Sequence, residues 1–366
     1  MKRQGHPTIA PRLSLSTVAC LAAGCIVHDS GVRATAGGGA VAASSAAGGI
    51  APPGYNRTGS PALPAPPGGG ATRPSGPAGN LTVLDWAGFR AAVTYTFDDA
   101  NSSQIQHYSE LQALGVRMTF YLITGKRPEF GDPIWARAVR DGHEIGSHSK
   151  SHQHGGTAAD MDASNQAIRQ TLGVDAWTMA APYGDASYIP LAPDHYLINR
   201  GVANGAIGPG DETDPFNLFC YIPPAGAKAA AFNAEVDAAR GAGKWKTVLV
   251  HGFVGGTDGA YQAVSIDEFI AGVNHAKSFG DVWIDSMVNV GAYWRAQKVF
   301  AAIVPTTSGN SKTWTWTLPP HFPPGKLLRV KVDGGTLTQP GGRKLAWDEH
   351  GYYEVALDAG SLTLSP

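Results

Sequence analysis

Short apolar runs alternate with stretches of helical periodicity between residues 83 and 300, and this pattern predicts strands and helices in turn. The runs over 91–97 and 247–250 are rich in β-branched and aromatic residues, as buried strands are. From residue 105 to 114 apolar side chains recur near helical spacing, and Gly115 then ends the predicted helix. Further strands are predicted over 116–123, 143–147, 176–180 and 282–284, and further helices over 134–139, 158–172 and 290–299 and from residue 265 onward. Strand–helix alternation favours an α/β fold whose parallel strands are joined by crossover helices.

After residue 304 the pattern changes to strict alternation of apolar and polar residues, as in 328–332. Turns containing glycine separate these runs, so we predict a small all-β appendage over 301–366 that follows a main domain over 83–300. The appendage contains three tryptophans, Trp314, Trp316 and Trp347. They could form a platform on which sugar rings stack, but packing against the main domain is the favoured interpretation.

The first 82 residues differ in composition from the rest of the chain. Residues 26–82 consist mainly of Gly, Ala, Ser and Pro, which bury too little apolar surface to offset the entropy of ordering, so we predict a disordered linker. Residues 1–25 combine positive charge with a short apolar run, which is typical of an export signal and too short for a membrane span. The residues that end at Cys25 resemble a bacterial lipobox, although Ala22 stands where Leu is usual. We therefore expect an exported protein of the bacterial cell envelope or the extracellular space. Whether Cys25 is lipidated and tethers the protein to the membrane stays open.

Charge and cysteine content exclude two classes of protein. The net charge is −1 and no basic stripe is present, so nucleic acid is not an expected partner. Cys220 is the one cysteine of the sequence beyond the N-terminal segment, so an intramolecular disulfide framework in the main domain is excluded. We expect Cys220 to be a small buried side chain.

Two motifs follow predicted strands and carry groups suited to a metal site. Asp98 and Asp99 come directly after the run over 91–97, and His148 and His152 follow the strand over 143–147. The carboxyl ends of parallel strands gather at one face of an α/β fold, so we expect these side chains to meet. One carboxylate and two imidazoles form a three-ligand set that leaves a divalent metal an open position. Adjacent carboxylates repel each other, and a metal held by Asp99 would neutralise one of them and leave Asp98 free as a general base.

Two further positions can complete a hydrolytic site. Tyr183 lies in the tight loop Pro-Tyr-Gly, which can present a backbone N–H to a developing oxyanion but is also an ordinary turn. His251 follows the strand over 247–250, and an imidazole with a pKa of about 6.5 is suited to donate a proton to a leaving group. A buried core histidine would fit the same position. His143 stands at the start of its strand rather than after it, and should therefore lie at the opposite end of the sheet.

Four segments, in this order, resemble the motifs of the polysaccharide deacetylase family, the NodB-homology domain of carbohydrate esterase family four. They are Thr-Phe-Asp-Asp at 96–99, Gly-His-Glu-Ile-Gly-Ser-His-Ser-Lys-Ser-His at 142–152, Ala-Pro-Tyr-Gly at 181–184 and Leu-Val-His at 249–251. The resemblance covers residues 85–300 and implies a distorted (β/α) barrel that uses zinc or a similar divalent ion. The roles that it implies are general base for Asp98, metal ligands for Asp99, His148 and His152, oxyanion donor for Tyr183 and general acid for His251.

The chain departs from the family pattern at two places. The family usually has an arginine two residues before Pro182, where it contacts the catalytic base, and this chain has Ala180. An aspartate often supports the acidic histidine in the family, and Asp211 and Asp214 are candidates for it here.

The motifs and the resemblance together predict metal-assisted hydrolysis of acetyl groups on a polysaccharide. The expected substrate is a glycan based on N-acetylglucosamine, such as chitin or a cell-wall glycan. An O-acetyl esterase acting on xylan would use the same residues. A metal-independent amidase of the same fold and a non-catalytic envelope carbohydrate-binding protein also stay open.

Overall fold

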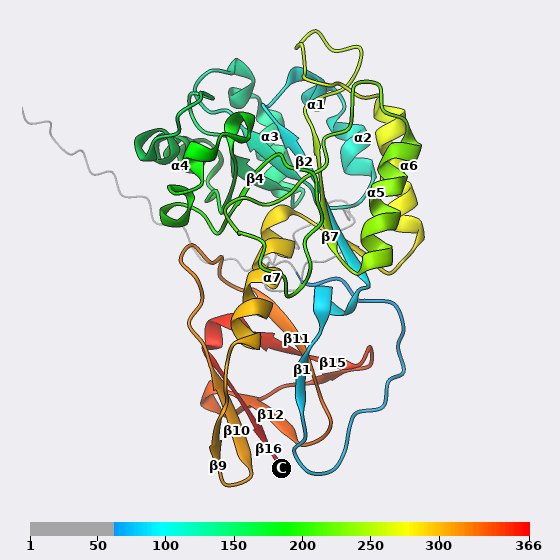
Figure 1. Ribbon diagram of the computed structural model, residues 1–366, viewed down its shortest axis with the longest axis vertical. Coiled ribbons are helices and arrows are strands. Elements are labelled where there is room, and N and C mark those ends of the chain that lie inside the picture. The colour runs from blue at the N-terminus through cyan, green and yellow to red at the C-terminus, as the bar shows by residue number, and fades with distance from the viewer. Residues whose placement is uncertain (1–61) are drawn as a thin grey trace, which may run out of the picture. The chain divides into compact units, whose positions relative to one another are not determined.

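The computed structural model describes residues 62–366 (Figure 1). The predicted export signal over 1–25, the lipidation of Cys25 and the first part of the predicted linker, 26–61, lie outside these residues. Within the described part of the chain, no helix is both long enough and apolar enough to cross a membrane.

Seven parallel strands form the main sheet, in the order β6-β5-β4-β3-β2-β7, with β8 paired to the start of β2 (Figure 1). The strands are β2 Ala91–Asp98, β3 Thr119–Leu122, β4 Glu144–Ser147, β5 Thr178–Ala180, β6 Ile198–Arg200, β7 Trp245–Val250 and β8 Val282–Ile284. Every residue of β2 and β7 is buried, as continuous apolar runs in a covered parallel sheet should be.

The segment 218–221 closes this sheet into a ring. The N–H of Leu218 donates to the carbonyl of Asn199 in β6, at 3.0 Å. The N–H of Tyr221 donates to the carbonyl of Thr247 in β7, at 2.9 Å. A short irregular segment therefore stands where a further strand would complete a regular barrel, and the expectation of a distorted (β/α) barrel is confirmed. All the strands run in one direction, so their carboxyl ends open at the same end of the barrel.

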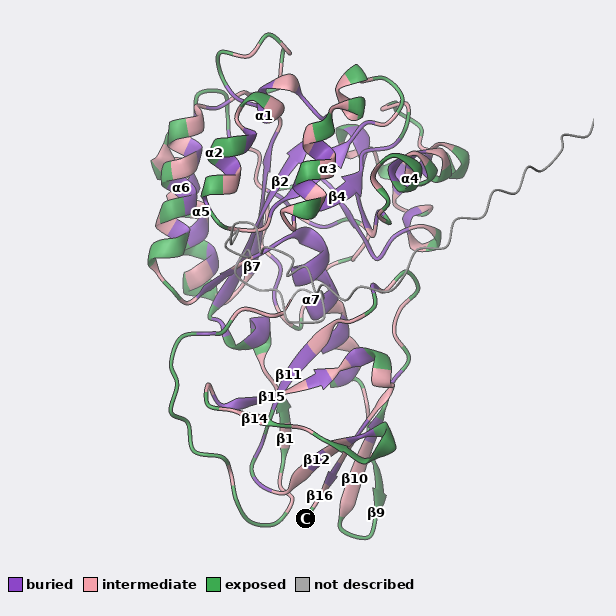
Figure 2. Ribbon diagram, turned by 180° about the vertical axis from the view of Figure 1, so that it is seen from behind, coloured by how far each residue is buried: buried purple, intermediate pink, exposed green. Residues whose placement is uncertain are grey.

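Helices surround the sheet, and several of their ends follow from the local sequence. Asp132 caps the start of α3, where Pro133 occupies the first turn, and Thr157 caps α4, which Gly173 ends at a φ of 72°. The helices are α1 Ser102–Gln106, α2 Tyr108–Ala113, α3 Pro133–Arg140, α4 Ala158–Leu172, α5 Ala229–Ala242, α6 Ile266–Ser278 and α7 Met287–Ala301. Figure 2 shows α7 buried along most of its length, between the barrel and the C-terminal strands.

The C-terminal strands form two antiparallel sheets, and the predicted all-β appendage is therefore present. One sheet has the order β1-β11-β15-β14 and the other β13-β12-β16-β10-β9. The strands are β1 Leu81–Val83, β9 Thr306–Ser308, β10 Ser311–Thr315, β11 Leu327–Val332, β12 Thr336–Gln339, β13 Arg343–Lys344, β14 Trp347–Asp348, β15 Tyr352–Ala356 and β16 Ser361–Ser365. Trp314 and Trp316 are buried against Phe300 of α7, with ring centroids 6.2 and 5.7 Å away, which confirms packing for these two tryptophans.

Residues 62–82 correct the predicted linker, because they are part of the folded structure rather than a disordered tether. Strand β1 pairs in register with β11, from Leu81 opposite Val332 to Val83 opposite Val330. The buried guanidinium of Arg329 donates to the carbonyls of Leu63 and Pro64 at 3.1 and 2.8 Å. This segment is held mainly by backbone hydrogen bonds to distant residues, so its low apolar content did not reveal its order.

Candidate active site

A cavity of about 480 Å³ opens at the carboxyl ends of the barrel strands, and we call it the strand-end cavity. It is lined by Asp98, Asp99, His148, His152, Ala181, Tyr183, Val202, Ile222, Leu249, His251 and Tyr261. The six site residues predicted from the sequence are all among these, although they come from four separate loops. The common direction of the strands explains why residues so far apart in the sequence meet.

Asp99, His148 and His152 form a group suited to hold a metal ion. One ligand atom from each lies within 4.8 Å of the others, and Oδ1 of Asp99 is 3.4 Å from Nε2 of both histidines. That oxygen is buried and has no hydrogen-bond partner among the described residues. Nδ1 of His148 donates to the carbonyl of Ala180 at 2.8 Å, which directs the unprotonated Nε2 toward Asp99. The donor set of one oxygen and two nitrogens therefore fits a divalent ion such as zinc.

The backbone around these ligands is strained in a way that aims them inward. Asp99 and His152 have φ values of 78° and 46°, which few residues other than glycine adopt. Ser149, at a φ of 60°, accepts a hydrogen bond through Oγ from the N–H of His152 at 3.0 Å and closes the turn between the two histidines. Hydrogen bonds and burial thus compensate for conformations that would be unfavourable in an isolated loop.

The three ligands perturb one another's proton affinity. Burial alone would raise the pKa of Asp99, but the nearby charge of His148 brings it well below its usual range. Burial alone would lower the pKa of His148, but the charge of Asp98 raises it above the ordinary value. Burial, and then the charge of His148, lowers the pKa of His152 to about 4. Asp99 is therefore ionised and His152 neutral at neutral pH, the states in which both bind metal.

Asp98 ends β2 beside this group and pairs with an arginine that the sequence analysis did not identify. Nη2 of Arg200 donates to Oδ2 of Asp98, and both side chains are buried. Oδ1 of Asp98 is also buried, and within the described chain it has no hydrogen-bond partner. One carboxylate oxygen is thus held by a cation while the other is left available in the cavity.

Arg200 accounts for the arginine missing at position 180. Strands β5 and β6 are parallel neighbours, and Ala180 pairs in register with Arg200. Side chains at paired positions point to the same face of a sheet, so the guanidinium reaches Asp98 from one strand further along. The signal in the sequence was the short run Ile198-Asn199-Arg200, and β6 was missed because two of its three residues are polar.

His251 follows β7, and its main chain is tied to the loop after β2. Its carbonyl accepts from Nδ2 of Asn101 and Nε2 of Gln104, both at 2.7 Å. Burial is the leading cause that lowers the pKa of His251. Nδ1 is buried and lacks a hydrogen-bond partner in the part of the chain that the structure describes. The imidazole therefore has no supporting carboxylate there.

Asp211 and Asp214, the two candidates for that carboxylate, cap turns instead. Asp211 accepts from the N–H groups of Gly208 and Thr213, and Asp214 accepts from the N–H of Phe216 at 2.9 Å. Short polar side chains that accept from the backbone two residues later are common in turns, and the sequence alone did not separate that role from a catalytic one.

Tyr183 stands on the cavity wall in the turn Pro182–Gly184, at a φ of 57°. Its ring packs beside His152 and His154, with centroids 4.5 and 4.1 Å away, and its side chain is 56% exposed. The loop therefore lies at the site, and the role of its backbone N–H as an oxyanion donor stays a prediction.

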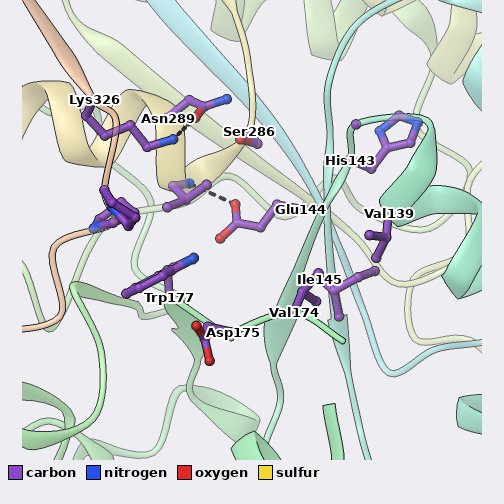
Figure 3. A pocket seen from close by; sticks show the side chains of 14 residues that line it. Val139, His143, Glu144, Ile145, Val174, Asp175, Trp177, Ser286, Asn289 and Lys326 are labelled. Carbon is purple, nitrogen blue, oxygen red and sulfur yellow. Dashed lines mark hydrogen bonds between the residues drawn. The ribbon is translucent and has the colours of Figure 1, made fainter. Parts of the chain in front are cut away.

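A second cavity, of about 290 Å³, lies at the other end of the strands, where β4 begins (Figure 3). Its polar groups are already paired: Glu144 accepts from Thr119, Thr178 and the N–H of Val288, and Lys326 donates to Asn289 at 2.6 Å. These bonds join β4 to the start of α7 and to the C-terminal strands. We therefore interpret this second cavity as part of the packing between these elements rather than as a binding site. His143 lines it, at the end of the sheet opposite the candidate active site, as the sequence predicted.

Comparison with known proteins agrees with the geometry. The model of the polysaccharide deacetylase family matches residues 89–191, which include the paired aspartates, both ligand histidines and Tyr183. Arg200 and His251 lie beyond the matched segment, so their assignment rests on the geometry described above. A gellan lyase from Bacillus sp. is 30% identical over 149 residues, which are 38% of this chain and 6% of that protein. The chain thus corresponds to only 6% of the length of this curated relative.

Three solved structures were also found to be similar. A putative polysaccharide deacetylase from Mycobacterium smegmatis aligns with 19% identity and a TM-score of 0.43, over 61% of this chain and 96% of that one. A peptidoglycan deacetylase from Bacillus subtilis aligns with 18% identity and a TM-score of 0.36, over 54% and 89%. A family 4 acetyl xylan esterase from Clostridium thermocellum, in complex with a cobalt ion, aligns with 16% identity and a TM-score of 0.34, over 54% and 89%.

Proposed function

Because residues 89–191 match the model of the polysaccharide deacetylase family, we propose that this protein is a metal-dependent hydrolase that removes acetyl groups from a polysaccharide. The proposed substrate is a glycan based on N-acetylglucosamine, chitin-like or from a cell wall. The observation that carries the proposal is the meeting of Asp99, His148 and His152 at one cavity with an arginine-held Asp98 beside them. A binding module would not need an unpaired buried carboxylate oxygen next to a ligand set.

Asp99, His148 and His152 would hold the ion, and zinc is the proposed metal because the set has two nitrogens and one oxygen. When bound, such an ion polarises the acetyl carbonyl and increases the acidity of the attacking water. The protein supplies a fixed site, since Ala180 orients His148 and Ser149 fixes the turn to His152. Fixed ligands reduce the reorganisation that the reaction needs.

Asp98 is the proposed general base. Water attacks the acetyl carbon, and its proton passes to Oδ1 of Asp98, since Arg200 engages the other oxygen. The backbone N–H of Tyr183 would donate to the oxygen that becomes negatively charged. His251 would then give a proton to the nitrogen as the carbon–nitrogen bond breaks, which releases acetate and a free amine. Its lowered pKa makes the imidazolium a stronger proton donor.

The direct test is acetate release from acetylated chitin oligomers, cell-wall glycan and acetylated xylan, before and after treatment with a chelator and after zinc is added back. Release from the N-acetylated glycans that is lost with the chelator and restored by zinc supports the proposal. Release only from xylan would make the protein an O-acetyl esterase, and release that resists chelation would indicate a metal-independent amidase. Binding without any release would indicate a carbohydrate-binding protein.

Two substitutions separate the catalytic roles from folding. Asp98→Asn and His251→Ala should each reduce kcat by about 10²–10⁴-fold while the circular dichroism spectrum and the metal content are retained. Activity within about tenfold of the wild type in either variant would remove that residue from the mechanism.

Export to the cell envelope or the medium is part of the proposal and rests on residues 1–25 alone. Fractionation of producing cells tests it, and recovery of the full-length chain from the cytosol only would contradict it. Labelling with a fatty acid that is lost in Cys25→Ala would support the lipid tether.

A further inference from the structure

Three of the five large hydrophobic residues that are exposed in the described part of the chain line the strand-end cavity. The five are Tyr183, Val202, Val254, Tyr261 and Val304. Tyr183, Val202 and Tyr261 line the cavity, and Val254 lies in the same loop as Tyr261. Val304 follows α7 and is not among the cavity residues. Apolar surface concentrated at one concave site, rather than scattered, is typical of a ligand contact.

The loop 252–264, which carries Tyr261, is held in place at several points. Its Asp258 accepts from the N–H of Ser103 at 2.6 Å and from the hydroxyl of Ser102 at 3.3 Å, at the start of α1. Phe253 and Val264 are buried and form a bridge to each other. Tyr261 is therefore exposed on an anchored loop.

The position of Tyr261 itself is specified by its neighbours. Its ring meets that of His251 nearly at right angles, at a centroid distance of 5.2 Å. Nε2 of Gln262 donates to the Tyr261 hydroxyl at 3.2 Å, and Gln262 has a φ of 48°. A left-handed conformation at a residue other than glycine is unfavourable and is retained only where other contacts enforce it. The fold thus presents Tyr261, a residue that is 59% exposed, with its ring directly beside the proposed general acid.

A second exposed ring borders the same set of groups. Tyr183 stacks on His154 with an interplanar angle of 14°, and Nδ1 of His154 donates to Asp185 at 3.0 Å. Tyr183 also contacts His152, whereas Tyr261 contacts His251. Tyr183 therefore stands beside the ligand His152, and Tyr261 stands beside the proposed general acid.

We infer, resting on the proposed function, that Tyr261 and its anchored loop bind the sugar unit next to the one that loses its acetyl group. A pyranose ring has an apolar face of C–H groups and a rim of hydroxyls, and a tyrosine offers an apolar face and a polar tip in the same way. The Gln262 amide donates to the Tyr261 hydroxyl and so places a polar group at the edge of the ring. The protein then prefers a chain of sugars over a single acetylated unit.

The test measures kcat/KM for the N-acetylglucosamine monomer and for its oligomers of two to six units with the wild type, Tyr261→Ala and Tyr261→Phe. The alanine variant should lose about tenfold more on the oligomers than on the monomer, mainly through KM, which corresponds to about 1.4 kcal/mol. The phenylalanine variant keeps the ring and should stay close to the wild type on both. Val304→Ala removes the exposed hydrophobic side chain that is remote from the cavity and serves as the matched control.

An equal loss on the monomer and on the oligomers, or a loss confined to kcat, would overturn the inference, because it would mean that Tyr261 acts only through His251. Asp258→Ala, which releases the loop from α1, should weaken the preference for oligomers over the monomer in the same direction as Tyr261→Ala.

The inference can fail or stand separately from the proposed function. If no glycan loses acetate, calorimetric titration of the full chain with the N-acetylglucosamine hexamer still decides it. Binding that depends on Tyr261 but not on Val304 supports the sugar site without catalysis. Binding that Tyr261→Ala leaves unchanged, or no binding at all, refutes it.

Discussion

The pairing of Asp98 with Arg200 leads to a specific exchange experiment. Arg200→Ala removes a fully buried guanidinium and leaves a buried carboxylate without its cation. Breaking a buried ion pair from one side typically costs about 3–5 kcal/mol, since the remaining charge is no longer compensated. The freed carboxylate can also rotate, so that Oδ1 is no longer held toward the substrate. We expect a loss of at least about 100-fold in kcat/KM, at the lower end of what general-base catalysis supplies.

The double variant Ala180→Arg with Arg200→Ala should recover part of that loss. Ala180 pairs with Arg200 in register on the neighbouring strand, about 4.8 Å away, and its side chain points to the same face. The space vacated by the guanidinium is available to the new side chain. We expect recovery of about tenfold in kcat/KM, equivalent to about 1.4 kcal/mol. Ala180→Arg alone should destabilise the protein by about 1–3 kcal/mol, because the arginine at 200 still fills the space.

Acetate release and urea unfolding provide the two measurements, and Arg329→Ala is the matched control. Arg329 is a buried arginine that is ion-paired with Glu354 in the C-terminal sheets, remote from the cavity. The Arg329→Ala variant should have a lower free energy of unfolding without a selective loss of kcat. Activity of Arg200→Ala within about threefold of the wild type would refute the positioning role, as would losses that merely match those of Arg329→Ala.

Three further outcomes are expected. Nδ1 of His143 accepts from the N–H of Met118, so the imidazole is buried neutral and its pKa is lowered to about 4, chiefly by burial. At this residue the unfolded chain gains a proton below about pH 6.5 and the folded chain only below about pH 4, so the free energy of unfolding should fall by about 3 kcal/mol across that window. Urea unfolding at pH 7 and pH 4.5 should show a smaller fall in His143→Gln than in the wild type, and an equal fall in both would contradict this. His152→Ala should abolish bound zinc in elemental analysis while the unfolding transition is retained, and unchanged zinc content would remove His152 from the ligand set. Trp316→Ala should destabilise the protein by about 3–5 kcal/mol, since the ring packs on Phe300 and donates to the Leu357 carbonyl at 2.7 Å, and a cost below about 1 kcal/mol in thermal unfolding would speak against that packing.

The predicted site residues met because their positions depend on one simple rule. Asp99, His148 and His251 each follow a fully buried strand, and the carboxyl ends of parallel strands open together. Periodicity likewise located α4 with its observed bounds, because its cap at Thr157 and its ending at Gly173 are local signals.

Other features depended on partners that local patterns do not reveal. Strand β6 is short and polar, and its burial is compensated by Asp98, which lies 102 residues away. The single helix predicted over 105–114 is instead α1 and α2, which meet at His107. The segment over 62–82 looked like a linker because its order comes from β11 and Arg329 rather than from its own side chains.

The pairing of β1 with β11 places the barrel as an insertion within the C-terminal β fold. Residues 81–83 are made before the barrel, and their partners over 330–332 are made after it, so this sheet cannot be completed until the whole barrel has been made. Bringing such distant segments together has a large entropic cost unless an intervening folded body holds their ends close, and the barrel supplies that body. The C-terminal sheets should therefore form last, and truncation that removes residues 81–83 should expose an unpaired edge on β11, with aggregation as the consequence.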